Sequence, residues 1–126
     1  MSTPLMAVSA LIDDYFEGLY RSDSAILRKV FHPSALYACA SSGTLLTLTM
    51  GAYFEVIDQR PSPASRGDLR TDRIVSIEFA GPVTALARLT CSILPKHYTD
   101  LLTLVHVDGR WQVIAKVFHF EEGFTP

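Results

Sequence analysis

The residues best suited to chemistry in this sequence are a tyrosine, an aspartate and a histidine near its C-terminal end. Tyr98 and Asp100 begin the run YTDLLTLVHV-DG-RWQVIAKVFH, and His119 ends it. A carboxylate in a dry setting can abstract a proton next to a carbonyl group, and a neighbouring imidazole or phenol can orient it or donate to an oxyanion. A hydrogen-bonded pair with a purely structural role fits the same residues. Asp100 and His119 are therefore the candidate catalytic residues, with the structural role left open.

These three residues come together only if residues 98–119 fold as a β-hairpin. Asp108-Gly109 between two β-rich runs is a strong hairpin signal, because both central residues of such a turn need positive φ. With an uninterrupted register, His119 pairs with Tyr98, and Asp100 lies beside them on the same face. Because side chains alternate across a strand, we expect this face to be apolar near the turn and polar at its far end.

The rest of the chain predicts helices first and a long antiparallel meander afterwards, which is the α+β class. Thr3-Pro4 is a helix start, and apolar residues then recur at three- and four-residue spacing. Shorter helices are expected after Asp23 and after Thr49, followed by a loop over residues 60–70. Strands are expected over residues 35–39, 44–49, 73–79 and 83–94 and in the final hairpin. The sheet should curl around the N-terminal helix as a cone with an open mouth.

Aromatic side chains are expected to surround the polar end of this cone. Tyr15 lies on the apolar stripe of the first helix, so its hydroxyl needs a partner or a cavity. Tyr53 on the third helix is expected in the pocket wall. The expected ligand-binding residues are Tyr15, Tyr53, Tyr98, Asp100, Trp111 and His119.

Composition narrows the function classes. The 126 residues predict one domain over residues 1–126, with 48% hydrophobic and 19% charged residues. A net charge of −2 argues against nucleic-acid binding, and no apolar run is long enough to span a membrane. No secretory leader is recognised, so we expect a cytoplasmic protein with buried, reduced Cys39 and Cys91. The scattered histidines indicate no metal site, and no cofactor-binding motif is present.

The other face of the final hairpin is too apolar for a solvated sheet face. Apolar patches of this kind mark protein interfaces, so we expect a homodimer formed sheet against sheet. The residues expected on this face are Leu101, Ile114, Lys116, Phe118 and Phe120.

Three stretches resemble the nuclear-transport-factor-two-like superfamily, also called SnoaL-like or cystatin-like, and within it the bacterial subgroup labelled putative lumazine-binding. They are YFEGLYRSDSAILRKVFHPSA at residues 15–35, RPSP at 60–63, and the hairpin run at 98–119. The resemblance implies a cone-shaped α+β barrel, a pocket between sheet and helices, and dimers through the sheet. The superfamily includes ketosteroid isomerases, polyketide cyclases and dehydratases as well as non-catalytic domains, so the fold does not supply the function.

Three functions therefore remain open. The first is a small-molecule-binding domain with a mostly apolar pocket. The second is an isomerase, cyclase or dehydratase that acts by proton transfer with Asp100 as the base. The third is a protein-association module without a ligand.

Overall fold

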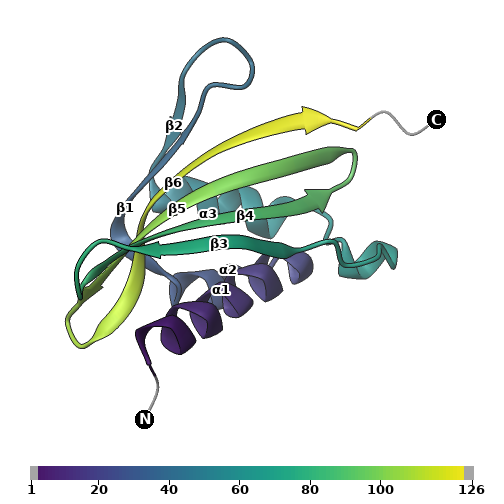
Figure 1. The fold of residues 1–126 in the computed structure, drawn as a ribbon. Helices are drawn as coiled ribbons and strands as arrows, with labels where there is room; N and C mark the ends of the chain where they lie inside the picture. The colour runs from purple at the N-terminus through teal and green to yellow at the C-terminus, as the bar shows by residue number, and fades with distance from the viewer. Residues whose placement is uncertain (1–2, 124–126) are drawn as a thin grey trace.

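The computed structural model describes residues 3–123 and has helices on one side of a curved sheet (Figure 1). Its helices are α1 (Pro4–Arg21), α2 (Ser24–Arg28), α3 (Met50–Gln59) and the short 3-10 helix η1 (Ala64–Arg66). Its strands are β1 (Phe31–Cys39), β2 (Leu46–Leu48), β3 (Arg73–Phe79), β4 (Thr84–Ile93), β5 (Lys96–Val107) and β6 (Arg110–Glu122). The strands form one sheet in the order β2-β1-β6-β5-β4-β3, in which only the β1–β6 pair is parallel. The predicted α+β fold with a curved, mostly antiparallel sheet is confirmed.

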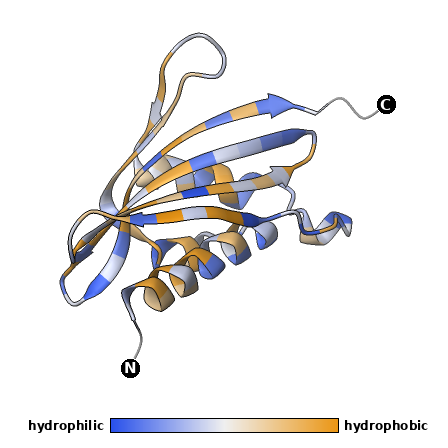
Figure 2. Ribbon diagram, viewed as in Figure 1, coloured by the Kyte–Doolittle hydropathy of each residue, from blue (hydrophilic) through white to orange (hydrophobic). Residues whose placement is uncertain are grey.

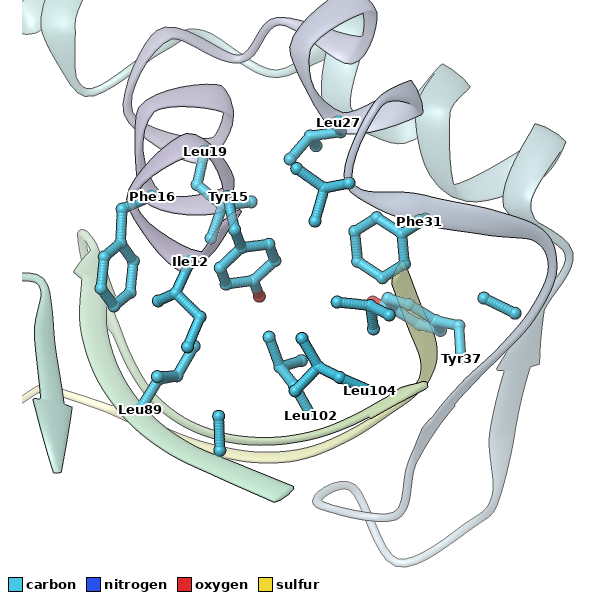
Figure 3. Packing of buried hydrophobic residues seen from close by; sticks show 14 of the residues in the cluster. Ile12, Tyr15, Phe16, Leu19, Leu27, Phe31, Tyr37, Leu89, Leu102 and Leu104 are labelled. Carbon is cyan, nitrogen blue, oxygen red and sulfur yellow. The ribbon is translucent and has the colours of Figure 1, made fainter. Parts of the chain in front are cut away.

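Residues next to helix α1 cap both of its ends. The Thr3 side chain accepts a hydrogen bond from the Met6 backbone N–H, and Ser22 ends the helix with a positive φ of 49°. Gly18 permits α1 to approach α2, because a Cβ at this position would lie 2.6 Å from Cδ2 of Leu27. The buried residues of α1 are Val8, Ile12, Tyr15, Phe16, Gly18 and Leu19. Figure 3 shows the side chains of Ile12 and Tyr15 directed from α1 toward the curved sheet.

Every second side chain of strand β4 points to the concave face of the sheet. Hydropathy alternates along the strands in Figure 2, as expected for a sheet with one buried face. The inward residues of β4, all of them buried, are Ala85, Ala87, Leu89, Cys91 and Ile93. The free thiols of Cys39 and Cys91 are buried, as the sequence predicted.

The final hairpin has the predicted turn but a different register beyond it. Asp108 and Gly109 have φ values of 55° and 80°, and Leu104 pairs with Val113 as counting from the turn predicts. The register then shifts between Thr103 and Leu104, so that Thr103 pairs with Ala115. A β-bulge of this kind places an extra residue on one strand and reverses the facing of every residue beyond it.

The bulge overturns part of the predicted site. Tyr98 pairs with Phe120 and Asp100 with Phe118, whereas His119 was expected opposite Tyr98. The His119 side chain is 60% exposed and lies on the other face, where its Nδ1 is 2.9 Å from Oγ of Ser41. The expectation that His119 joins Tyr98 and Asp100 is therefore wrong.

The same shift changes the predicted outer face. Lys116 and Phe118 are buried, and Phe120 packs against the core, so these three residues do not belong to an outer surface. Leu101 is exposed and Ile114 is half-buried, as expected for outward residues. None of the helices between residues 3 and 123 is long and apolar enough to span a membrane.

Candidate functional site

A buried lysine lies among aromatic rings inside the cone. Lys116 on β6 is only 5% exposed, and its Nζ donates a hydrogen bond to Oη of Tyr53 at 3.2 Å. The ammonium also lies 4.9 to 5.7 Å from the ring centroids of Tyr15, Tyr37, Tyr53 and Phe118. Cation–π contacts of this kind are strongest where water is excluded. The bulge is the reason for this placement, because it turns Lys116 inward.

Asp100 lies in the same interior and keeps one oxygen without a partner. Its carboxyl group is 1% exposed, and Oη of Tyr15 donates a hydrogen bond to Oδ2 at 2.5 Å. Figure 3 shows the Tyr15 hydroxyl directed from α1 toward the sheet. Oδ1 is buried and has no hydrogen-bond partner within residues 3–123. Buried polar atoms are nearly always paired, so this oxygen is an acceptor available to a water molecule, a ligand or a proton.

The environment determines which of these groups are charged. Burial raises the pKa of Tyr15 well above its usual value, and the nearby Asp100 raises it further. Burial also raises the pKa of Tyr53, although the charge of Lys116 opposes the rise. Burial by itself lowers the pKa of Lys116, but Tyr53 and Asp100 outweigh it and the net direction is upward. The phenols are therefore neutral at neutral pH, and the direction of the pKa shift favours the ammonium form of Lys116 over the nucleophilic amine.

A small cavity lies among these groups. Tyr53, Asp100 and Lys116 line it together with half-buried Arg60 and Tyr98. Its volume is about 20 Å³, the space needed by a single water molecule. The remaining lining residues are Leu19, Tyr37, Cys91, Ile93 and Phe118.

Two of the expected ligand-binding residues lie elsewhere. His119 is on the outer face, and Trp111 lies near the turn of the hairpin, where its ring packs against Phe79 and His106 with centroids 5.8 and 5.5 Å away. Trp111 lines a separate open groove with Leu11, of about 370 Å³. The structure brings Tyr15, Tyr53, Tyr98 and Asp100 together, and Trp111 was wrongly assigned to their pocket.

Sequence reasoning missed Lys116 and Tyr37 as residues of this cavity. One signal was available for the lysine, since it lies within the apolar run Ile114-Ala115-Lys116-Val117-Phe118. Neither face of a strand with this sequence is polar, so either register leaves the lysine among apolar neighbours. Tyr37 has no comparable signal, because it reaches the cavity from a distant part of the chain.

Within the part of the chain that the structure describes, no group of three or more His, Cys, Asp or Glu side chains is arranged to hold a metal ion.

Comparison with known proteins identifies a family and relates the fold to solved structures. The family described as putative lumazine-binding matches residues 4–119. Aldolase FrzH of Cladobotryum sp. is 28% identical over 115 residues, which cover 90% of this chain and 88% of that protein. A nuclear-transport-factor-two-like protein of unknown function from Shewanella baltica has a TM-score of 0.84 and 26% identity, covering 98% of this chain and 100% of its own. One from Silicibacter pomeroyi has a TM-score of 0.83 and 22% identity, covering 96% and 100%.

Proposed function

Since this chain belongs to the putative lumazine-binding family of the nuclear-transport-factor-two-like superfamily, we propose that it binds a small organic molecule at the cavity between Asp100 and Lys116. The observation that carries the proposal is the unpartnered Oδ1 of Asp100, buried beside that cavity within the described chain. A mostly apolar, aromatic wall with a few convergent polar groups is typical of small-molecule sites.

A ligand larger than water requires the cavity to widen. The present volume of about 20 Å³ accommodates a single water molecule. Arg60 and Tyr98 on the cavity lining are half-buried, whereas Tyr15 and Tyr53 are fully enclosed. Rotation of the Arg60 and Tyr98 side chains is therefore the least disruptive way to admit a ring.

Ligand-observed NMR with a collection of ring-containing fragments tests this function. We expect fragments that bind the wild type to lose binding in Asp100→Asn, because the substitution removes the negative charge and replaces one carboxylate oxygen with an N–H donor. His119→Asn is the matched control, since His119 lies outside the cavity and its replacement should leave binding unchanged. Fragments that bind both variants equally, or a collection without any binder, would contradict the proposal.

A second function, proton transfer next to a carbonyl group, is favoured by the same carboxylate. Oδ1 of Asp100 would take the proton, and the electron pair would move onto the carbonyl oxygen, where the Lys116 ammonium stabilises the negative charge. Tyr15 would orient the carboxylate through its hydrogen bond. Similarity to a protein named an aldolase supports this route, because aldol chemistry begins with such a proton abstraction.

Exchange of the α-hydrogens of phenylacetone in heavy water measures this step directly by NMR. We expect the wild type to accelerate exchange, His119→Asn to retain the acceleration and Asp100→Asn to lose it. An unchanged rate in Asp100→Asn would eliminate Asp100 as the base while leaving ligand binding possible.

A homodimer through the outer face of the sheet is the proposed assembly, with a revised set of residues. That face carries four apolar side chains that are 38 to 53% exposed: Leu36, Leu86, Leu101 and Val117. Leu101 and Val117 are directly paired across β5 and β6. Sedimentation should show a dimer at micromolar concentration and a monomer for Leu101→Asp, with Leu94→Asp in the β4–β5 turn as the exposed control. A monomeric wild type would refute the dimer.

A further inference from the structure

The cavity at Asp100 contains more positive than negative charge. Its lining includes two cationic side chains, Lys116 and Arg60, and a single acidic one, Asp100. Neither cation takes part in an ion pair within residues 3–123. The lining therefore carries one more positive than negative charge beside an almost fully buried lysine, which is unfavourable unless a further group supplies a counterion.

The hydrogen-bond donors of these two side chains are also largely unused. The ammonium of Lys116 has three N–H groups, and its one hydrogen bond within the described chain goes to Oη of Tyr53. The guanidinium of Arg60 makes no hydrogen bond to any described residue. Its charge nevertheless reaches the cavity: burial raises the pKa of Tyr98, and Arg60 is the main influence opposing that rise.

Aromatic rings form the walls beside these donors. The Tyr37 ring centroid is 4.8 Å from that of Tyr53 and 5.0 Å from that of Phe118, and Tyr98 lies 5.8 Å from Phe118. Aromatic surfaces with cationic groups at one side favour a flat molecule with one negatively charged end.

We infer that the ligand is a small planar organic anion whose single charged oxygen group faces Lys116 and Arg60 and whose ring packs against Tyr98 and Phe118. The inference rests on the proposed binding function and adds the charge and shape of the ligand. Asp100 then has a further role, because its negative charge disfavours a second anionic group on the same molecule.

Benzoate and benzamide test this charge preference, because they have nearly the same size and shape and differ in charge. Isothermal titration of the wild type should show benzoate binding about tenfold more tightly than benzamide, the effect usual for one charge-assisted hydrogen bond. Added salt should weaken benzoate binding and leave benzamide binding unchanged. Arg60→Gln and Lys116→Met should each reduce the preference to below about threefold, mainly by weakening benzoate.

Arg60→Gln keeps the test decisive if Lys116→Met does not fold, because the Arg60 side chain is half-buried and makes no described hydrogen bond. His119→Asn should retain the wild-type preference. Equal or tighter binding of benzamide would overturn the inference while leaving the binding function intact. Benzoate affinity unchanged in Arg60→Gln would also overturn it, since the charge would then be held elsewhere. Binding of neither probe to the wild type would refute the proposed function for ring-sized ligands and this inference with it.

Discussion

Replacement of Tyr15 by phenylalanine should destabilise the protein well beyond the loss of an ordinary hydroxyl. The hydroxyl donates to Oδ2 of Asp100 at 2.5 Å, and the other oxygen of that carboxyl group already lacks a partner in residues 3–123. After the substitution the buried carboxyl group would have no hydrogen bond from the described chain. The Lys116 ammonium is not close enough to form an ion pair with it.

Because Tyr15 and Asp100 are both buried, the expected loss of stability in Tyr15→Phe lies near the top of the range usual for a lost hydrogen bond to a charged group. A hydrogen bond to a charged group contributes about 1.5–3 kcal/mol, and water cannot replace it readily at a side chain that is 1% exposed. We therefore expect a loss of about 3 kcal/mol in the free energy of unfolding, measured by urea denaturation. For a chain of this length the melting temperature should fall by ~12 °C, at about 4 °C per kcal/mol.

Tyr20→Phe is the matched control. The Tyr20 hydroxyl donates to the Asp68 backbone oxygen at 2.7 Å in a partly buried position, so its removal should cost about 1 kcal/mol. A double-mutant cycle with Tyr15→Phe and Asp100→Asn should give a coupling energy above ~1 kcal/mol. A Tyr15→Phe cost equal to that of Tyr20→Phe, or strict additivity in the cycle, would refute the reasoning.

Three further predictions concern pH, packing and thiol reactivity. Burial raises the pKa of Tyr37 to about 12 and also raises that of Tyr53, so these phenols ionise at lower pH in the unfolded chain than in the folded one. The free energy of unfolding should therefore be at its full value below about pH 10 and fall between about pH 10 and 12. A urea midpoint that rises over this pH range would contradict the prediction. Gly18→Ala should cost about 1–3 kcal/mol because its Cβ would lie 2.6 Å from Leu27, whereas Gly51→Ala, with 4.0 Å of clearance, should be neutral or stabilising in urea denaturation. Burial raises the pKa of the Cys91 thiol to about 12, so iodoacetamide at about pH 8 should label it only after unfolding, as mass spectrometry can check; rapid labelling of the folded chain would show an accessible thiolate.

Most of the secondary structure could be predicted because its signals are local. Thr3, Asp23 and Thr49 begin helices with capping hydrogen bonds from their own side chains, which are properties of a few consecutive residues. The turn at Asp108-Gly109 follows from the positive φ that both residues adopt. Strand β4 was predicted with the correct buried face because its alternation is uninterrupted.

The candidate site could be predicted only in part. Tyr15 was recognised as a buried phenol that needs a partner, and Asp100 supplies the acceptor. Lys116 was assigned to the wrong face and His119 to the wrong cluster, because both lie beyond the bulge in β6. Trp111 precedes the bulge and faces inward as predicted, but the length of the strand places it near the hairpin turn, away from Asp100.

The sequence by itself determined the helices, the hairpin turn, the fold family, the burial of the Tyr15 phenol and the inward face of Asp100. Each of these depends on residues that are close in the chain or on an alternation read along one element. The tertiary structure decided which polar groups meet, because the bulge arises where β6 pairs with β5 on one side and with β1 on the other. The β1–β6 register also shifts, between Phe31 and Leu36, where Pro33 cannot donate a backbone hydrogen bond. Because of a single extra residue in that pairing, Lys116 rather than His119 lies in the interior. The site therefore contains a buried positive charge in place of the expected imidazole.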